Sequence, residues 1–476
     1  MRDYRQVYID GAWVDPQGGD AMEVISPVTE RPIGQITLAT AADVDRAVEA
    51  ARRAFRSFSR TTRQERIDLL GSVLASFAKR HQDLADALVE ELGAPATFAK
   101  DLQVGVGFLH LQTGIEVLKT YAFEHAQGGR TTVRREAIGV IGMITPWNWP
   151  INQIMCKIVP ALATGNTMVH KPSEVTPFTA HIIAEILHEA GVPQGVYNLV
   201  NGTGSTVGAA ISGHPGIDMV SFTGSTRAGI DVAKRAADHV TRVHQELGGK
   251  SPNIVLDDAD LRKAVTESVY RLMMNSGQTC HAPTRLLVPA AKLQQATEFA
   301  VQAVQSVKVG DPNEDVYMGP VVSERQWTRI QELIRQGIAE GATLAVGGEG
   351  RPKGLETGYY VRPTIFTNVR NDMMIAREEI FGPVLCILSY RDVEDAISIA
   401  NDTIYGLAAY VQSATDAHAE EVAARLQAGT VYINGAGEDP EAPFGGYKMS
   451  GNGREWGEIA FGEFLETKAV IRREAA

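Results

Sequence analysis

Short apolar runs separated by helix-like stretches recur through most of the chain, and this alternation is the feature that most constrains the fold. Apolar strands alternating with helices are typical of parallel sheets, because the crossover helices must cover both faces. Helix-like stretches include Thr176–Ala190, Leu261–Met274 and Glu324–Ala339. The apolar runs are AIGVIGM (137–143), TMVH (167–170), VYNLV (196–200), DMVSF (218–222), NIVL (253–256), TRLLVP (284–289), VLCILSY (384–390) and TVYIN (430–434). The pattern predicts an α/β protein.

The number of strands indicates more than one domain. A single sheet with so many strands would be unusually large. At about 150 residues per domain, a chain of 476 residues has room for two to three domains. No clear linker marks a boundary, and we place it near Gly248-Gly249.

Charge and composition exclude several classes of partner and location. The chain has 45 Lys and Arg residues against 57 Asp and Glu residues, so its net charge is −12. Binding to nucleic acid or an anionic membrane needs clustered positive charge, and no long basic run is present. Three cysteines exclude a disulfide scaffold and indicate a reducing compartment. The N-terminus resembles no signal peptide, and polar residues and prolines interrupt the most apolar region, 137–165. We therefore expect a cytoplasmic protein.

Several familiar motifs fail on spacing. GGKS (248–251) lacks the earlier glycine of a phosphate-binding P-loop, and GTGSTVG (202–208) has its third glycine one residue late for a dinucleotide fingerprint. By spacing alone, GTGSTVG is an ordinary turn into a helix. HExxH and CxxC motifs are absent from the sequence, so we expect no metal site.

Cys280 is the first candidate for chemistry. It lies in NSGQTCHAPTR, among small polar residues on a connection, where reactive residues tend to be found. Local context does not decide between a nucleophile and a small buried hydrophobe. Cys156 and Cys386 lie in apolar runs, and we interpret both as core residues. Neighbouring side chains usually point apart, so we do not expect Cys280 and His281 to form a dyad.

Two further polar residues have a chemical and a simpler interpretation. Asn148, in the stiff loop ITPWNWP, can offer an amide donor to a developing oxyanion, or it can be a turn asparagine that bonds its own backbone. Glu246, in HQELGGKSP, can act as general base on water, or it can be a surface carboxylate near a helix end. Taken singly, each residue favours the simpler interpretation.

Two motifs that follow apolar runs are candidates for nucleotide binding. FTGSTRAG (222–229) opens a helical stretch, where free N–H groups and the helix dipole favour a phosphate. The alternative for its serine is a simple helix cap. KPSE (171–174) follows TMVH. Its lysine and glutamate can form hydrogen bonds with ribose hydroxyls, or they can form a solvated ion pair.

Taken together, these motifs resemble those of the NAD(P)-dependent aldehyde dehydrogenase superfamily, in order and in separation. The resemblance covers nearly the whole chain. It rests on TPWNWP, KPSE, FTGSTRAG, ELGGKSP, SGQTC, EEIFGPV (378–384) and PFGGYKMSGNGRE (443–455). Seven ordered motifs are far more specific than any one of them.

The resemblance implies an architecture of three parts. A Rossmann-like cofactor domain comprises residues 1–118 and 142–248, and an α/β catalytic domain comprises residues 249–450. A small β extension, residues 119–141 and 460–476, pairs subunits into a homodimer or homotetramer.

The resemblance also implies roles for individual residues. Cys280 matches the family nucleophile, Glu246 the general base and Asn148 the oxyanion amide. The residues that match cofactor-cleft positions are Ile144, Trp147, Lys171, Glu174, Gly204, Gly224, Ser225, Leu247, Glu379 and Phe381. Among them, Lys171 and Glu174 hold the adenosine ribose and Ser225 contacts the pyrophosphate. Glu379 holds the nicotinamide ribose, with Phe381 packed near it.

The implied activity is the oxidation of a small aldehyde to its carboxylic acid. Cys280 forms a thiohemiacetal and then a thioester, which is hydrolysed by a water that Glu246 deprotonates. This glutamate favours hydrolysis over transfer to coenzyme A, and the carboxylate of Glu174 would repel a 2′-phosphate, so NAD is favoured over NADP. Two alternatives stay open: a catalytically silent structural or binding member of the fold, and an esterase that uses the same cysteine.

The substrate is the least constrained element. Glu438, Asp439 and Glu441 lie just before PFGG, a segment that borders the substrate tunnel in the family. We expect this acidic cluster either to favour polar or cationic aldehydes or to be an ordinary solvated loop. Cys156 replaces an aromatic residue that is frequent in relatives, and it would widen the tunnel if it faces it.

Overall fold

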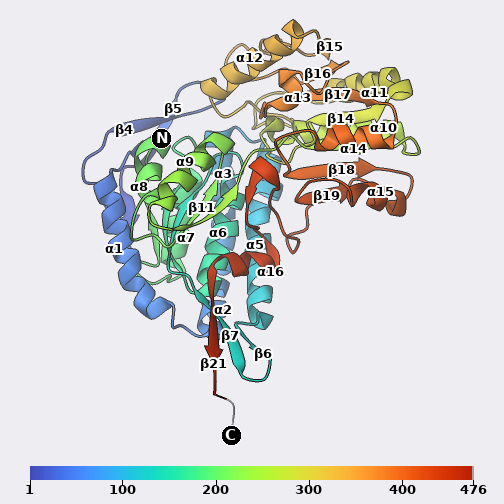
Figure 1. Cartoon of the computed structure of the whole chain (residues 1–476). Helices are drawn as coiled ribbons and strands as arrows, with labels where there is room; N and C mark the ends of the chain where they lie inside the picture. The colour runs from blue at the N-terminus through green and yellow to red at the C-terminus, as the bar shows by residue number, and fades with distance from the viewer. Residues whose placement is uncertain (474–476) are drawn as a thin grey trace.

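Two large sheets form the body of the protein, and two small sheets lie at its margins (Figure 1). The computed structural model describes residues 1–473. The predicted α/β fold is confirmed, because helices cover both large sheets and the apolar runs of the sequence form strands of these sheets.

The first large sheet has the strand order β20-β12-β11-β8-β9-β10-β2-β3. Its strands are β2 (Val7–Ile9), β3 (Ala12–Val14), β8 (Val140–Ile144), β9 (Thr167–Lys171), β10 (Tyr197–Leu199), β11 (Met219–Thr223), β12 (Arg242–Glu246) and β20 (Gly451–Asn452). The strands from β12 to β10 are parallel. β9 and β11 lie on opposite sides of β8, so the strand order reverses there, which is where doubly wound sheets bind ligands.

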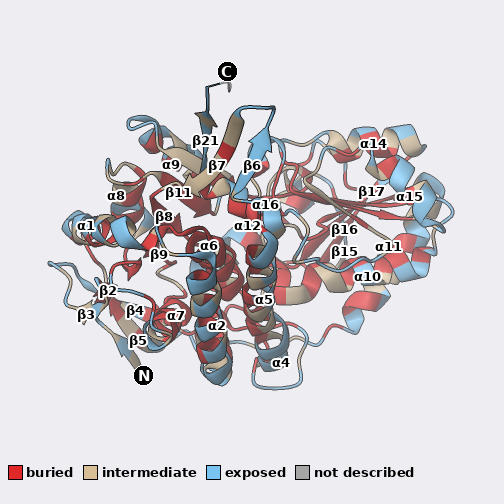
Figure 2. Cartoon of the chain, turned by 90° about the horizontal axis from the view of Figure 1, so that it is seen from below, coloured by how far each residue is buried: buried red, intermediate tan, exposed pale blue. Residues whose placement is uncertain are grey.

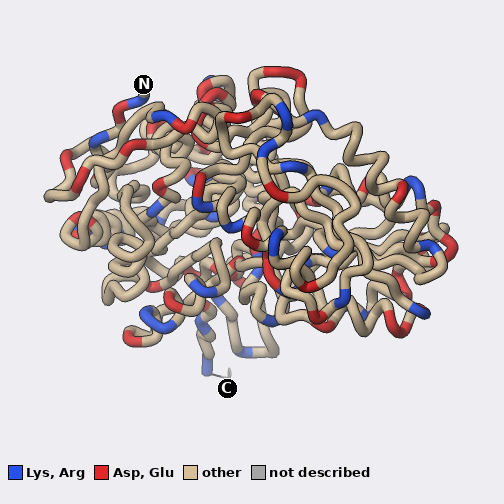
Figure 3. The backbone as a smooth tube through the Cα atoms, turned by 90° about the horizontal axis from the view of Figure 1, so that it is seen from above, with Lys and Arg blue, Asp and Glu red and all other residues tan. Residues whose placement is uncertain are grey.

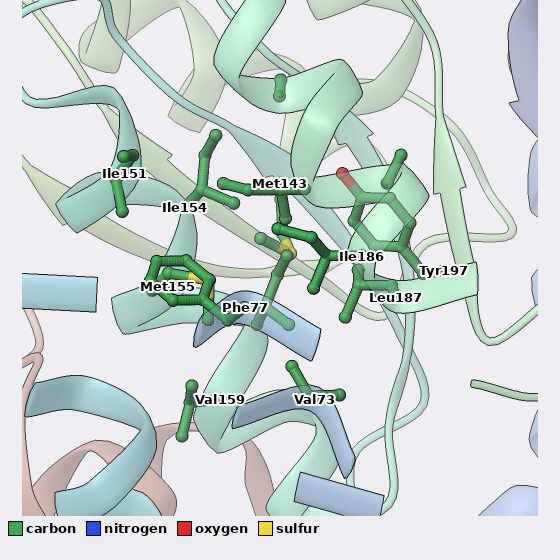
Figure 4. Packing of buried hydrophobic residues seen from close by; sticks show 14 of the residues in the cluster. Val73, Phe77, Met143, Ile151, Ile154, Met155, Val159, Ile186, Leu187 and Tyr197 are labelled. Atoms are coloured by element: carbon green, nitrogen blue, oxygen red, sulfur yellow. The ribbon is translucent and has the colours of Figure 1, made fainter. Parts of the chain in front are cut away.

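Helices cover both faces of this sheet, and the side chains of β8 alternate between them. Ile141 and Met143 pack into the core formed with α2, α5, α6 and α7, shown in Figure 4, whereas Val140 and Ile144 pack on the other face with α1, α8 and α9. These helices are α1 (Ala41–Phe58), α2 (Arg63–Lys79), α3 (His81–Leu92), α5 (Val104–Thr120), α6 (Pro150–Thr164), α7 (Phe178–Glu189), α8 (Ala209–Ser212) and α9 (Thr226–Ala237). Shorter turns are α4 (Ala96–Phe98), η1 (Ala99–Gln103) and η2 (Gly204–Gly208).

The second large sheet has the order β15-β16-β17-β14-β13-β18-β19, and only β15 runs antiparallel to its neighbour. Its strands are β13 (Pro252–Val255), β14 (Arg285–Pro289), β15 (Thr343–Val346), β16 (Thr364–Thr367), β17 (Val384–Tyr390), β18 (Ala408–Gln412) and β19 (Thr430–Ile433). Its helices are α10 (Leu261–Met273), α11 (Leu293–Gln305), α12 (Glu324–Ala339), α13 (Met374–Arg377), α14 (Val393–Asn401) and α15 (Asp416–Ala423), with turns η3 (Met274–Gly277) and η4 (Ala290–Lys292). The chain crosses between the two large sheets through residues 247–251.

A small antiparallel sheet of order β21-β7-β6 projects from the body (Figure 1). It comprises β6 (Glu124–Gln127), β7 (Thr131–Ala137) and β21 (Leu465–Ile471), and Figure 2 shows β6 exposed. η5 (Lys448–Ser450) and α16 (Gly457–Glu463) lead into β21. The predicted extension, 119–141 and 460–476, includes this sheet, but residues 474–476 lie outside the described residues. A second small sheet, β1-β5-β4, comprises β1 (Arg2–Tyr4), β4 (Ala21–Ile25) and β5 (Pro32–Thr37).

Charges are interspersed over the surface (Figure 3), in agreement with the absence of a basic run in the sequence. No helix within residues 1–473 is long and apolar enough to cross a membrane.

A buried carboxylate fixes the start of α7. The side chain of Glu91, in α3, accepts hydrogen bonds from the backbone N–H groups of Phe178 (2.6 Å) and Thr179 (3.0 Å). It also accepts one from the Thr179 hydroxyl at 2.9 Å. The first N–H groups of a helix have no partner within the helix, so Glu91 supplies the hydrogen-bond acceptors for the start of α7. It thereby anchors the end of the loop that follows Lys171 and contains Glu174.

We predict that Glu91→Ala destabilises the protein, because it leaves two buried N–H groups unpaired. The expected loss is about 2 kcal/mol or more, equivalent to about 4–8 °C in melting temperature for a unit of roughly 200 residues. Differential scanning calorimetry measures it. Glu90→Ala is the matched control, because Glu90 is partly exposed and pairs only with Arg2 at the surface. Equal melting temperatures for the two variants would contradict the prediction.

Candidate active site

The carboxyl ends of the parallel strands bring most of the predicted cofactor residues to one edge of the first sheet. β8, β9, β10, β11 and β12 each end there and continue into a predicted segment. The residues at or just beyond these ends are Ile144, Trp147, Lys171, Glu174, Gly204, Gly224, Ser225 and Leu247. A Cβ built on Gly208 would lie 3.9 Å from both Ile144 Cδ1 and the Lys171 side chain, so these strand ends adjoin one another.

The second sheet contributes the amino ends of three adjacent strands. Gly248-Gly249 precedes β13, Cys280 precedes β14 and Glu379 precedes β17. Glu379 Oε1 accepts a hydrogen bond from the Gly249 N–H at 2.8 Å. A Cβ on Gly249 would lie 2.4 Å from the carbonyl oxygen of Cys280, so only glycine fits there without a backbone shift. The nucleophile candidate and Glu379 therefore meet around one glycine pair.

Cys280 is partly exposed and packs against a small apolar cluster of Cys156, Leu407, Phe444 and Trp456. Burial raises the pKa of its thiol, and the negative charges of Glu246 and Glu379 raise it further. These two carboxylates therefore lie close enough for their charges to act on the sulfur. Cys156 and Cys386 are buried, as predicted, but Cys156 shares its cluster with Cys280.

Asn148 is buried and bonds the loop that carries Cys280. Its Nδ2 donates to the carbonyl oxygen of Gln278 at 3.2 Å, so the simpler prediction, a turn asparagine bonded to its own backbone, is not what the structure shows. Asn275 and Ser276 of the same loop have left-handed φ values of 53° and 56°. Such backbone is costly for residues other than glycine, and it is found most often at functional sites.

Glu246 is the last residue of β12 and is buried, so the alternative of a surface carboxylate is wrong. Within residues 1–473, neither of its carboxylate oxygens has a hydrogen-bond partner. Burial raises its pKa well above the ordinary value, and the charge of Glu455 acts in the same direction. A Cβ on Gly445 would lie 2.6 Å from Glu246 Oε1, so the PFGG loop covers this carboxylate. An unpartnered buried carboxylate is costly and is a mark of a functional site.

A buried ion pair joins Lys157 of α6 to Glu455. Cys156 Sγ donates to the same carboxylate at 3.3 Å. Burial acts to raise the pKa of Glu455, but the charges of Lys157 and His244 outweigh it and hold the pKa below its ordinary value. Sequence reasoning did not identify this pair. A lysine inside the most apolar region of the chain was the available signal, because a lysine is almost never fully buried without a partner.

The other predicted cofactor residues show a range of contacts. Lys171 Nζ lies 2.8 Å from Glu174 Oε2, and the rings of Trp147 and Phe381 are perpendicular with centroids 5.3 Å apart. Ser225 is exposed and caps α9 by accepting the Ala228 N–H at 3.3 Å. Gly204 is exposed and begins η2, a π-helical turn of a kind that occurs frequently at functional sites.

Two expectations about the neighbourhood of Cys280 need correction. The His281 ring lies beside the thiol, with Nδ1 at 3.9 Å from Sγ, because a turn and not a strand carries these two residues. Glu438 pairs with Arg271 at 2.7 Å and with His281 at 3.1 Å. Its charge is thus matched within the protein and is not free to select a cationic aldehyde. Asp439 and Glu441 are exposed.

The comparisons with known proteins agree with this geometry. The model of the aldehyde dehydrogenase family matches residues 13–470. The chain is 53% identical to a 3-succinoylsemialdehyde-pyridine dehydrogenase of a Pseudomonas species, over the whole of both chains. The chain belongs to the aldehyde dehydrogenase family.

Solved structures of aldehyde dehydrogenases have the same fold. Aldehyde dehydrogenase C of Pseudomonas syringae, crystallised as a cysteine-to-alanine mutant with NAD+ and octanal, has a TM-score of 0.97 and 48% identity, covering 98% of this chain and 96% of that one. The NAD+ complex of an aldehyde dehydrogenase of Mycobacterium tuberculosis has a TM-score of 0.97 and 38% identity, with coverage of 100% and 99%.

We predict that Lys157→Met lowers the free energy of unfolding by about 3–5 kcal/mol, because it leaves a buried carboxylate unpaired. The double variant Lys157→Met with Glu455→Leu recovers most of that loss, since neither charge then remains. Chemical denaturation measures both. Lys119→Met is the control, because Lys119 forms only an exposed pair with Glu116. A double variant at least as unstable as the single one would refute the prediction.

Proposed function

We propose that the protein oxidises an aldehyde to the carboxylic acid with NAD, through acyl intermediates on Cys280. The observation that carries this proposal is that a partly exposed thiol lies near a buried carboxylate, Glu246, where the two large sheets meet. This carboxylate has no hydrogen-bond partner within residues 1–473. Membership of the aldehyde dehydrogenase family supports it.

The edge of the first sheet has the groups that a dinucleotide needs. Lys171 and Glu174 are suited to the adenosine ribose hydroxyls, and the free N–H groups at the start of α9, next to Ser225, to the pyrophosphate. Burial raises the pKa of Glu379 to about 7, and the nicotinamide ribose would give this carboxylate a second hydrogen-bond partner besides the Gly249 N–H. Relatives of the same fold were solved with NAD+. When bound, NAD supplies a hydride acceptor next to the substrate carbon.

Cys280 attacks the aldehyde carbon, and the oxyanion that forms needs hydrogen-bond donors. One N–H of the Asn148 side-chain amide donates to the carbonyl oxygen of Gln278, and the second N–H can donate to the oxyanion. The backbone N–H of Cys280 is the other donor. Each such donor contributes about 10²–10³ in rate.

Glu246 then takes a proton from the water that hydrolyses the thioester. A base works best when its pKa lies near the operating pH, and burial moves the pKa of Glu246 upward in that direction. The base must be ionised to act, so turnover is expected to rise with pH through this raised pKa and to fall at acidic pH.

The apolar cluster beside Cys280 is suited to an apolar or aromatic substrate tail. Phe444 and Trp456 stack with centroids 4.6 Å apart, and Cys156 occupies less space than an aromatic residue would. The relatives include an enzyme named for a pyridine semialdehyde and one solved with octanal. We favour such substrates over cationic aldehydes.

The projecting sheet is proposed to pair subunits into a homodimer or homotetramer. The central residues of β21 and all of β6 are exposed, and an uncovered strand edge invites pairing with another chain. Light scattering after size exclusion tests this. Cytoplasmic location stays a prediction from the cysteine content. Ester hydrolysis by Cys280 stays an alternative, which cofactor-independent ester cleavage without aldehyde oxidation would favour.

We predict that Glu246→Gln retains one burst of NADH per site but loses steady-state turnover by about 10²–10⁴, because only the hydrolytic step lacks its base. Stopped-flow absorbance of NADH with a small aldehyde panel separates the two phases. Glu267→Gln, at a half-exposed position of α10, is the control. Loss of the burst together with turnover would contradict the assigned role.

We predict that kcat/KM is higher with NAD than with NADP, because the Glu174 carboxylate repels a 2′-phosphate. Glu174→Gln narrows this ratio by about tenfold, a change of about 1.4 kcal/mol. Glu189→Gln, at the end of α7, is the matched control. A wild-type enzyme that uses NADP better would refute this prediction.

A further inference from the structure

The His281 ring has a fixed place next to Cys280. Its Nδ1 lies 3.9 Å from Sγ, and its Nε2 lies 3.1 Å from Glu438 Oε1. An ionised carboxylate only accepts hydrogen bonds, so Glu438 selects the tautomer that carries the hydrogen on Nε2. Nδ1 then carries a lone pair that can accept a hydrogen from the thiol. Cys280, His281 and Glu438 thus form a thiol–imidazole–carboxylate series.

Glu438 is in turn held by a second group of residues. Arg271 donates to its carboxylate at 2.7 Å, and the guanidinium lies over the rings of Tyr432 and Tyr410, at 4.5 and 4.8 Å from their centroids. The Tyr410 hydroxyl donates to the backbone carbonyl of His281 at 2.9 Å. Burial opposes ionisation of Glu438, but the hydrogen bond to His281 and the charge of Arg271 lower its pKa to about 2. The carboxylate is therefore ionised at every working pH.

Without a base, the thiol is poorly activated. Burial and the charges of Glu246 and Glu379 raise the pKa of the thiol more than hydrogen bonds from the backbone N–H groups of His281 and Cys280 lower it. Glu246 lacks a hydrogen bond to Cys280 and is required for the later hydrolysis. His281 is the group within reach of the sulfur that can accept a proton and whose resulting positive charge is compensated by a neighbouring carboxylate.

We propose that His281 is the base that accepts the proton of Cys280, with Glu438 as its positioning residue. This inference rests on the proposed function, in which Cys280 is the nucleophile. The S–H bond breaks, the proton moves to Nδ1 and the electron pair stays on sulfur, so nothing is oxidised or reduced. The imidazolium that forms donates from Nε2 to Glu438, and the thiolate is ready for the aldehyde.

Alkylation of the resting enzyme tests this step without aldehyde or NAD. Iodoacetamide is applied from pH 5.5 to 10, and mass spectrometry follows the peptide that contains Cys280. We expect His281→Gln and His281→Phe to slow alkylation at pH 7 by about tenfold and to move the midpoint of the profile up by about one pH unit, because the thiolate fraction changes tenfold per pKa unit. Glu438→Gln moves it in the same direction by less.

The controls separate a proton-accepting role from a structural one. Asp439→Asn, at an exposed neighbour, keeps the wild-type profile, and Cys280→Ser loses the label. The difference between the His281 variants and wild type is smallest at the alkaline end of the range, where hydroxide ionises a growing fraction of the thiol without help. Profiles of both His281 variants that coincide with wild type overturn the proposal, and so does a lower rate at every pH without a shift in midpoint. Failure of the wild-type enzyme to oxidise any aldehyde would instead overturn the proposed function, while the alkylation profile still reports on His281.

Discussion

The close contact between the Gly248-Gly249 pair and its neighbours is the constraint on which the site depends. The chain leaves the first sheet after Glu246 and enters the second at Pro252, and between them it passes against Glu379 and the carbonyl of Cys280. Any side chain at Gly249 would push this carbonyl away. This close backbone contact therefore holds the carboxyl ends of one sheet next to the amino ends of the other. As a result, Cys280 lies beside the sheet edge that we propose binds the dinucleotide.

Near this contact the protein buries ionisable side chains, and burying an ionised group lowers stability unless the group is paired. Lys157 and Glu455 offset each other, whereas Glu246 has no partner among the described residues. Burial of Glu246 costs stability and raises its pKa, and both properties fit the proposed role as a base toward water. His281 is different, because its partner Glu438 is itself paired with Arg271.

Local patterns predicted the elements that follow simple periodicity. The helix predicted at Glu324–Ala339 is α12 with the same bounds, and the apolar runs that end before Trp147 and Lys171 are β8 and β9. β12 was missed, because its sequence RVHQE is polar although it lies inside a buried sheet. Tertiary contacts bury this strand, because His244, Gln245 and Glu246 are buried although their side chains are polar. A search for apolar runs cannot find such a strand.

By itself, the sequence determined the fold class and, through seven ordered motifs, the family and the identity of Cys280, Glu246 and Asn148 as candidates. These conclusions depend on residue type and order, which can be read from the sequence without the folded structure. Only the tertiary structure decided which partners they have. Glu455 lies 298 residues from Lys157, and Glu438 lies 157 residues from His281, distances over which no local pattern connects two side chains. Such pairs exist only because sheet packing brings their elements together, so their charge balance can be known only from the folded chain.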